Sequence, residues 1–503
     1  MLSLLAISSC TDDLDTKPEV EQTLDDLLAD DPDAVAGLLS RLYATFALSG
    51  PDGPSSSDIS DNAGESPFLR GIVNLQDFTA DGMKNRWGDD GLDQLTTTSN
   101  WDENNKFFRY LYNRIYYTIP QANNLLVILE SETVEDQEQV RSEVRFLRAL
   151  AYYYLIDCFS KGVLATDQNY GTSAPLPEAS RAELFSFVEQ ELLDIEPLTA
   201  ASNDYGRANK ATVQMLLAKL YMNAGVYTGE SRYTEALVYI NKIIQEGNYS
   251  LAPDFLINFS GDNDSSPEII FPLLADAESS QSFGNTTYIV NGNLSTETLT
   301  TTDFGATQGW TGHRATKAWY GLFGDLATTT DDRALLFWTE GHNFEMNDYR
   351  EWTDGYPSIK FRNSGFSTDL PSTDFSGTDF PLFRLADAYL MYAECVLRNA
   401  EGGDLNQALG YVNQIRERSN ATPINEAELD LDFILDERAR ELNLEGHRRS
   451  DLIRFGKFTG GSYLWPWKGN TVQGTAIPDT YELFPIPLSA LEANTNLTQN
   501  PGY

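Results

Sequence analysis

Apolar residues recur about every three or four positions along much of the chain, and this spacing predicts amphipathic α-helices. Helices are expected at about residues 21–47, 101–130, 135–160, 182–193, 208–247, 382–418 and 426–445. We expect Pro32 to interrupt the first of these helices and Pro120 to kink the second. Two other stretches, at about 49–100 and 250–380, are rich in Gly, Ser, Asn and Asp and lack the helical period. The pattern therefore predicts a mainly α protein with two long loop-rich insertions.

A pair of helices is repeated within this pattern. The second helix of each copy, Glu235–Ile243 and Gln407–Ile415, has Ala, Leu, Tyr, Asn and Ile in the same register. In both copies a helix that contains alanine and tyrosine comes first, and a glycine-bearing turn follows it. Helix pairs of this kind cannot bury their apolar face alone and must stack on one another. We therefore predict a tetratricopeptide-like helix-pair scaffold, and two unrelated amphipathic hairpins are the alternative.

The composition narrows the classes of function. The chain has 503 residues, 41% of them hydrophobic, which is ordinary for a soluble globular protein. Its 75 acidic and 35 basic residues give a net charge of −40, a field that repels phosphate backbones, so we expect no nucleic-acid partner. Its three cysteines do not make a disulfide framework. Cys158 and Cys395 lie in apolar helical surroundings, where we expect them in the core.

The first residues indicate targeting. Residues 1–9 are apolar and then small, and Cys10 and several acidic residues follow them. The sequence Ile-Ser-Ser-Cys resembles the lipobox of bacterial lipoproteins, and the acidic residues after it resemble the surface-export signal of Bacteroidetes lipoproteins. Because no basic residues precede the apolar run, we expect the true start a few residues upstream. We predict a signal remnant at 1–9, acylation of Cys10 and a single domain over 10–503, with a chance cysteine as the alternative.

Five short motifs, taken in order, resemble the SusD/RagB family. They are Arg145–Tyr152, Gly206–Ala211, Asp436–Leu442, Glu445–Leu452 and Pro485–Pro487. The likeness covers nearly the whole chain from Cys10 to Tyr503. Two further stretches, Asn223–Gly229 and Tyr463–Gly469, resemble the starch-binding member of the family in particular.

The resemblance implies a non-catalytic lipoprotein of the outer membrane, anchored at the cell surface, that takes part in carbohydrate uptake. Members of the family bind glycans and lie as a lid on a TonB-dependent outer-membrane barrel of the SusC type. Tetratricopeptide-like helix pairs form the family's scaffold, in agreement with the repeat described above. We therefore expect a polysaccharide or oligosaccharide ligand, a SusC-like partner and a SusD-like fold.

A glycan site needs aromatic planes for the apolar faces of sugar rings, and donors and acceptors for the hydroxyls. Both insertions supply such residues. Matched to the starch-binding member, the expected site consists of Trp87, Tyr288, Trp310, Arg70, Asp90 and Asn62. Asp90 stands where that member has an amide, and Asn62 stands where it has an acid. The alternative for the two tryptophans is that they pack beneath the loops, as most tryptophans do.

The likeness favours a starch-type α-1,4-glucan as the ligand. A β-1,3-glucan of the laminarin type is the second choice, because it is also helical and the acidic composition suits a marine source. A glycoside hydrolase and a scaffold for protein partners stay open as alternatives. Positive signs of catalysis are missing, because the sequence has no zinc-protease, nucleophile-elbow or dinucleotide-binding motif and only three histidines.

Two further groups of residues were assigned from their surroundings. Five arginines lie beside acidic residues at helical spacing, and we expect them to form ion pairs and caps within the scaffold. They are Arg148, Arg438, Arg440, Arg448 and Arg449. No cofactor is expected, although Asp262-Asn263-Asp264 offers a short oxygen-rich cluster for Ca²⁺. Asp379 stands where some relatives have a calcium ligand, but Gly377 replaces a companion carboxylate, so solvated loop acids are the better interpretation.

Overall fold

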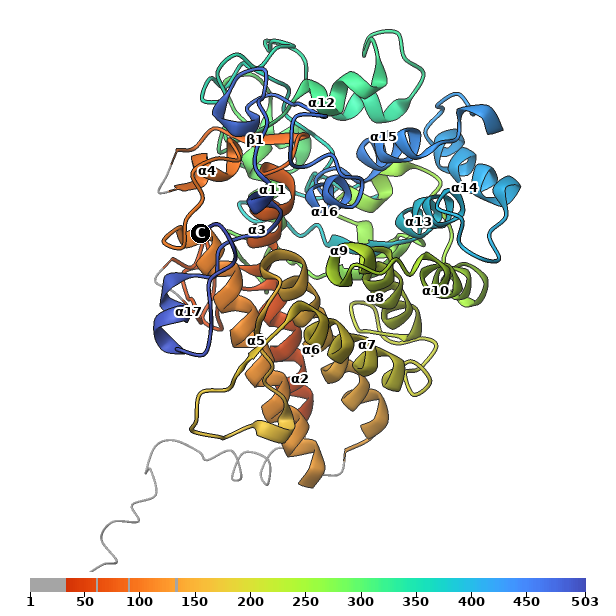
Figure 1. Cartoon of the computed structure of the whole chain (residues 1–503). Coiled ribbons are helices and arrows are strands. Elements are labelled where there is room, and N and C mark those ends of the chain that lie inside the picture. The colour runs from red at the N-terminus through yellow and green to blue at the C-terminus, as the bar shows by residue number, and fades with distance from the viewer. Residues whose placement is uncertain (1–32, 60–61, 89–90, 132–133) are drawn as a thin grey trace, which may run out of the picture.

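The computed structural model describes residues 33–59, 62–88, 91–131 and 134–503 of the chain (Figure 1). The longer helices are α2 (Ala34–Ala47), α5 (Lys106–Ser131), α6 (Gln137–Phe159), α7 (Arg181–Ile195), α8 (Lys210–Met222), α10 (Tyr233–Glu246), α13 (Leu385–Leu397), α14 (Leu405–Arg418) and α15 (Leu431–Leu442). The mainly α prediction is confirmed. Cys10 and Pro32 lie outside the described residues. Helix α5 continues through Pro120, and α15 begins later than expected because a separate turn precedes it.

Short elements complete the fold. The shorter helices are α3 (Phe68–Ile72), the π-helix η1 (Val73–Phe78), α4 (Leu92–Thr96), α9 (Ala224–Thr228), α11 (Thr286–Asn293), α12 (Lys317–Tyr320), α16 (Arg448–Arg454) and α17 (Leu488–Ala493). The 3₁₀ turns are η3 (Asp167–Asn169), η4 (Phe255–Phe259), η5 (Asn263–Ser265), η6 (Thr301–Phe304), η7 (Gly321–Phe323), η8 (Asp332–Leu336), η9 (Glu426–Glu428), η10 (Lys468–Asn470) and η11 (Asp479–Glu482). The strands are β1 (Met83–Asn85), β2 (Gly162–Val163), β3 (Glu178–Ala179), β4 (Ile269–Leu273), β5 (His313–Ala315) and β6 (Phe380–Arg384).

Several helices begin at residues whose side chains satisfy free backbone N–H groups. Ser180 and Glu183 form a capping box at the start of α7, and Asn209 caps α8 through the Thr212 N–H. Asp404 accepts the Gln407 N–H at the start of α14. These polar residues precede apolar periodic runs, so the sequence itself defines where the helices start.

The two predicted helix pairs are present and pack on each other. Helix α8 packs on α10, α13 packs on α14, and α10 contacts α13 between the pairs (Figure 1). The matched alanines of the second helices, Ala236 and Ala408, are fully buried. Each pair also stacks two tyrosines: the ring centroids of Tyr221 and Tyr239 are 5.9 Å apart, and those of Tyr389 and Tyr411 are 4.3 Å apart. The stacking of the pairs is therefore observed, whereas their assignment to the tetratricopeptide class stays a prediction.

The second insertion leaves and rejoins the helices at one place. Strands β4 and β6 lie at its two ends and pair antiparallel, with Ile269 opposite Arg384 and Leu273 opposite Phe380. The residues between these strands form an excursion that covers one end of the helices, drawn in green in Figure 1. Helical periodicity is weak there because short helices, strands and turns alternate.

A buried ion-pair network holds this excursion against the repeats. Glu441 of α15 accepts hydrogen bonds from Arg333 of the insertion at 2.9 Å and from Arg384 of β6 at 2.7 Å, and it also pairs with Arg418 of α14. Glu445 pairs with Arg384 at 2.7 Å and with Lys360 at 2.5 Å. The side chains of both glutamates, Arg333 and Lys360 are fully buried. Charges buried in this way are tolerated only when they are paired and hydrogen-bonded.

Four of the five assigned arginines form the ion pairs that were expected. Arg148 pairs with Glu191, Arg438 with Asp451, Arg440 with Glu437 and Arg448 with Asp81. Arg449 differs, because its guanidinium donates to the Glu482 carbonyl at 2.6 Å and lies over the ring of Phe484. Cys158 and Cys395 are buried free thiols, as predicted. None of the described helices is long and apolar enough to cross a membrane.

Asp77 gives a prediction about stability and pH. Burial raises the pKa of its carboxyl to about 7, although Oδ2 accepts the Gly446 N–H at 3.1 Å. The folded-state pKa lies above the unfolded value of about 4, so the folded protein holds this proton more tightly between those pH values. The stabilising contribution is complete below about pH 4 and is lost as the pH rises through about 7. We expect Asp77→Asn, which does not titrate, to flatten the dependence of the free energy of unfolding on pH in this window.

Urea unfolding of the variant and the wild type at several pH values between about 4 and 8 measures this effect. Asp52→Asn, at an exposed position, is the control and should follow the wild-type profile. Parallel profiles for Asp77→Asn and the wild type would contradict the prediction.

Candidate functional site

The two loop-rich insertions meet through a two-stranded sheet. Strand β1 of the first insertion pairs antiparallel with β5 of the second. The segment before β5 also runs along helix α11, because the N–H groups of Trp310 and Gly312 donate to the carbonyls of Asn291 and Gly292 at 2.7 and 2.8 Å. These contacts bring the aromatic residues of both insertions to one place.

Trp87 follows β1 and is partly exposed. Its ring centroid lies 5.4 Å from that of His313 and 6.1 Å from that of Tyr288. The backbone N–H of Trp87 donates to Asn85 Oδ1 at 2.7 Å, and this bond fixes the backbone at the end of β1. A Cβ at Gly312 would lie 2.5 Å from Cζ2 of the Trp87 ring, so only glycine allows this ring to pack there. Trp87 is therefore held firmly while part of its surface stays accessible.

Tyr288 lies beneath Trp87 and is fully buried, with 0% of its surface exposed. Its hydroxyl donates to Asn74 Oδ1 at 2.8 Å and accepts from Asn85 Nδ2 at 3.2 Å. Burial raises the pKa of the phenol to about 12. Tyr288 is one of the residues expected to bind a glycan, but its ring has no exposed face for a sugar to stack on. The reason is that helix α11 directs the ring inward, toward asparagines of the first insertion.

Arg70 and Asn62 belong to the same corner of the site. The guanidinium of Arg70 lies 4.3 Å from the centroid of the Tyr288 ring, and its Nη1 donates to the Gly64 carbonyl at 3.0 Å. Arg70 is 9% exposed, and its Nε has no partner among the described residues. Asn62 is exposed, and its Oδ1 accepts the Glu65 N–H at 3.0 Å. Both side chains thus hold the same turn, Arg70 through Gly64 and Asn62 through Glu65.

Trp310 lies in the segment whose backbone bonds to α11, and it is also partly exposed. Its ring centroid is 6.4 Å from that of Phe283, whose Cβ would be in contact with a Cβ at Gly64 at 3.4 Å. Phe283 therefore connects Trp310 with the turn that holds Arg70. Phe283 is an isolated phenylalanine in a polar loop, so no pattern in the sequence marks it as part of the site. Asp90, the remaining expected residue, lies outside the described residues.

His313 is a second residue that sequence reasoning did not assign to the site. Its ring is buried against Phe78, Trp87 and Tyr288, with centroid distances of 4.7, 5.4 and 4.6 Å. Burial, together with the charges of Arg70 and Arg314, holds the pKa of the imidazole well below 6.5. The ring is therefore neutral near pH 7 and supports Trp87 by packing. The described part of the site offers ring faces and hydrogen-bond donors, which suit binding.

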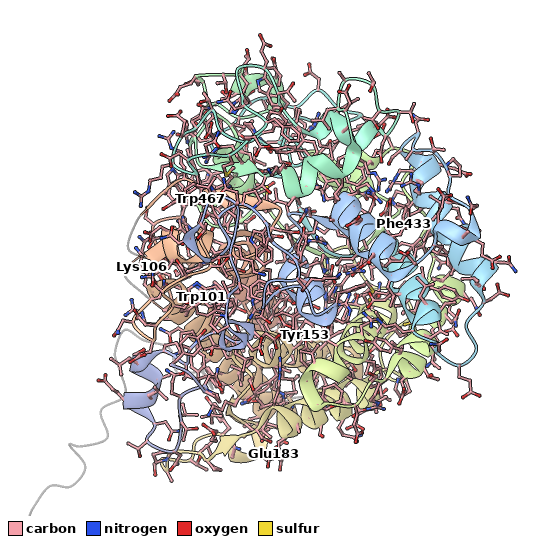
Figure 2. The ribbon with its side chains drawn as sticks, turned by 45° about the horizontal axis from the view of Figure 1, so that its top comes forward. Trp101, Lys106, Tyr153, Glu183, Phe433 and Trp467 are labelled. Carbon is pink, nitrogen blue, oxygen red and sulfur yellow. The ribbon has the colours of Figure 1, made fainter. Side chains whose placement is uncertain are left out.

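The chain's last hundred residues also support this region. Trp467 donates its ring N–H to the Met346 carbonyl at 3.1 Å, and the Asn470 N–H donates to the Thr97 carbonyl at 3.0 Å. Figure 2 shows Trp467 at the boundary between the two insertions. This segment therefore ties the first insertion to the second.

Two family descriptions match the chain. The SusD family matches residues 338–503, and a family described as starch-binding and associating with the outer membrane matches residues 63–224. The starch-binding protein SusD of Bacteroides thetaiotaomicron is 33% identical over an alignment that covers 99% of this chain and 96% of that protein. The chain belongs to the SusD family. The SusD-like protein P25 of Formosa agariphila is 26% identical, over 77% of this chain and 78% of that protein.

Solved structures of the SusD superfamily share the fold. A protein from Parabacteroides distasonis has a TM-score of 0.73 at 22% identity and covers 94% of this chain and 99% of its own. The surface glycan-binding protein A of Bacteroides thetaiotaomicron, solved with laminarihexaose, has a TM-score of 0.71 at 22% identity and covers 93% and 99%. The SusD-like fold prediction is therefore confirmed.

The acidic residues considered for Ca²⁺ in this SusD-family chain have other contacts. The Asp262 carboxylate accepts three backbone N–H groups, from Phe366, Ser367 and Thr368, at 2.6, 2.8 and 2.9 Å. Asp379 accepts the Ala275 N–H and the Tyr205 hydroxyl, and burial raises the pKa of its carboxyl to about 6. Within the described ranges, no three or more His, Cys, Asp or Glu side chains gather as a candidate metal site. Asp262 therefore stabilises the loop at residues 366–368 by accepting its backbone N–H groups.

A cavity of about 1480 Å³ lies away from the aromatic site. Its walls include Tyr43, Tyr205, Asp262, Leu274 and Asp379, and none of the five expected glycan-binding residues that the structure describes lines it. Residues of α2 and of the second insertion contribute to the walls of this cavity.

Proposed function

We propose that this SusD-family protein captures a glycan at the cell surface and does not act on it chemically. The observation that carries the proposal is the aromatic site: Trp87 and Trp310 are both partly exposed, and the Arg70 guanidinium lies against Tyr288, the ring beside Trp87. Tryptophan faces stack on the apolar faces of sugar rings, and a guanidinium donates to hydroxyls. In this proposal Asn62 and Asp90 also contact hydroxyls, and Tyr288 supports Trp87 from below.

The proposed ligand is a starch-type α-glucan. The relative that is 33% identical over nearly all of this chain is a starch-binding protein, and that likeness supports the choice. A β-1,3-glucan is the second candidate, because a structural neighbour is solved with laminarihexaose. A surface of partly exposed tryptophans binds a glycan weakly, and we expect a Kd on the order of micromolar to millimolar.

The cellular role follows from the family. We propose acylation at Cys10, an outer-membrane location at the cell surface, and delivery of the captured glycan to a SusC-like TonB-dependent barrel. The family description that names association with the outer membrane supports the location. One acyl chain gives marginal membrane binding, so we expect more than one on Cys10.

Native affinity electrophoresis of the chain from Thr11 onward tests the binding function. Gels contain amylopectin, laminarin, levan or xylan, and retardation by amylopectin is the expected result. Retardation by laminarin alone would replace the α-glucan with the β-glucan. No retardation in any gel would contradict glycan capture, and release of reducing ends from a retarding glycan would contradict the non-catalytic role.

A further inference from the structure

Two phenylalanines continue the aromatic surface beyond Trp310. Phe283 lies just before α11, and Phe375 lies just before β6. Their ring centroids are 4.9 Å apart with an interplanar angle of 47°, and the Phe283 centroid lies 6.4 Å from that of Trp310. The three rings therefore form a connected row on the second insertion.

Neither phenylalanine serves the hydrophobic core. Both are partly exposed and contact each other, whereas Trp87 and Trp310 also pack against the core cluster. Burial of apolar area stabilises the fold by about 25 cal/mol per Å², so the exposed parts of these two phenylalanine rings contribute nothing to folding. Contiguous exposed apolar surface next to polar groups marks binding sites.

Hydrogen bonds hold the Phe375 loop in place. The Thr373 hydroxyl donates to the Phe375 carbonyl at 2.6 Å, and the Ser376 N–H donates to the Thr287 hydroxyl at 2.9 Å. The next N–H, of Gly377, donates to Asn363 Oδ1 at 2.7 Å. The backbone at Phe375 and the two residues after it is thus held by these bonds within the protein itself.

The Phe283 segment is fixed by the proposed site itself. The Arg70 N–H donates to the carbonyl of Gly284, the residue after Phe283, at 3.0 Å. A Cβ at Gly284 would lie 2.4 Å from Cγ of Pro67, so the close approach of these two segments needs glycine. A pre-ordered surface loses less conformational entropy on binding, which favours affinity.

Polar groups accompany the two rings. The carboxylate of Asp374 is exposed and accepts the Thr307 hydroxyl. The carbonyl of Asp374 accepts the amide of Asn291 at 3.1 Å, and the Asn291 carbonyl in turn accepts the Trp310 N–H. An acceptor for sugar hydroxyls therefore lies beside Phe375, on the same framework that positions Trp310.

We propose that Phe283 and Phe375 form a second subsite, which binds additional sugar rings of a chain already held at Trp87 and Trp310. This inference rests on the proposed function and deepens it, because it makes the site selective for longer glucan chains. A short oligosaccharide occupies the tryptophans alone, and a longer one also stacks on the phenylalanines and reaches Asp374.

Isothermal titration with maltotriose and maltoheptaose tests the subsite, with laminaritriose and laminarihexaose as the second series. We expect the wild type to bind the longer oligosaccharide of its preferred series about tenfold more tightly than the trisaccharide. This ratio corresponds to a difference of about 1.4 kcal/mol in binding free energy. Phe375→Ala should lose most of that difference and keep the affinity for the trisaccharide. Phe375→Tyr keeps a flat ring and should retain the difference.

Phe366→Ala is the matched control, because Phe366 is a phenylalanine that is 44% exposed in another loop of the same insertion. It should leave both affinities unchanged. Equal weakening of short and long ligands by Phe375→Ala, or an unchanged ratio, would overturn the subsite while the proposed function stands. Absence of binding to every oligosaccharide and polysaccharide by wild type would instead remove the proposed function.

Discussion

Glu441→Ala is expected to destabilise the folded protein by about 3 to 5 kcal/mol, because it leaves buried guanidinium groups without their partner. Glu441 contacts Arg333, Arg384 and Arg418, and its side chain is fully buried. Burial alone would raise the pKa of this carboxyl, but the three arginines outweigh it and hold the pKa well below its usual range. Without this carboxylate, the positive charges of Arg333, Arg384 and Arg418 would repel one another in a low-dielectric interior.

Guanidinium unfolding of the variant and the wild type, with the free energy extrapolated to water, measures the effect. Glu417→Ala is the control, since Glu417 is exposed on α14, the helix that carries Arg418. A change below about 1 kcal/mol for Glu441→Ala, as is usual at surface positions, would show that the network contributes little.

Trp310→Ala is expected to remove glucan binding while the protein stays folded. Aromatic residues at the centre of a binding surface commonly contribute about 2 kcal/mol or more, which corresponds to roughly a 30-fold loss of affinity. Because Trp310 is partly exposed and its backbone is fixed to the Asn291 carbonyl, the loop should survive the loss of the ring. In amylopectin gels, the Trp310→Ala protein should migrate almost as fast as it does in gels without polysaccharide.

Trp338→Ala is the matched control for the loss of a tryptophan. Trp338 is another partly buried tryptophan of the second insertion, where it packs against Phe304. This variant should keep wild-type retardation. If amylopectin still slows the Trp310→Ala protein, and its melting temperature equals that of the wild type, the glycan must bind elsewhere on the molecule.

The helices could be predicted because the residues that determine each helix lie within it or directly before it in the sequence. Apolar spacing and polar caps such as Ser180 and Asn209 define α7 and α8 without knowledge of the rest of the chain. The repeat was equally visible, since Ala236 and Ala408 occupy equivalent buried positions. Element boundaries were less certain, as the late start of α15 shows.

The site was only partly predictable, because it depends on contacts between distant segments. Nothing near Asn85 in the sequence shows that its strand pairs with the strand of His313. The burial of Tyr288 depends on two asparagines of the other insertion, and the position of Phe283 depends on Gly64. Family resemblance supplied the identity of the aromatic residues, but their exposure is a property of the assembled fold.

The pairing of β4 with β6 has a consequence for how such proteins diversify. Since the second insertion departs and returns through two adjacent strands, its loops can change in length and sequence without altering the helices on which they rest. Selection for a new polysaccharide can then act on the surface loops of the insertion, while Arg333 and Lys360 keep their buried ion pairs with Glu441 and Glu445. The sharing of this architecture at 20 to 22% identity among solved relatives accords with such divergence. A lineage can thus change the glycan that it binds through substitutions in one surface insertion while the helical fold is kept.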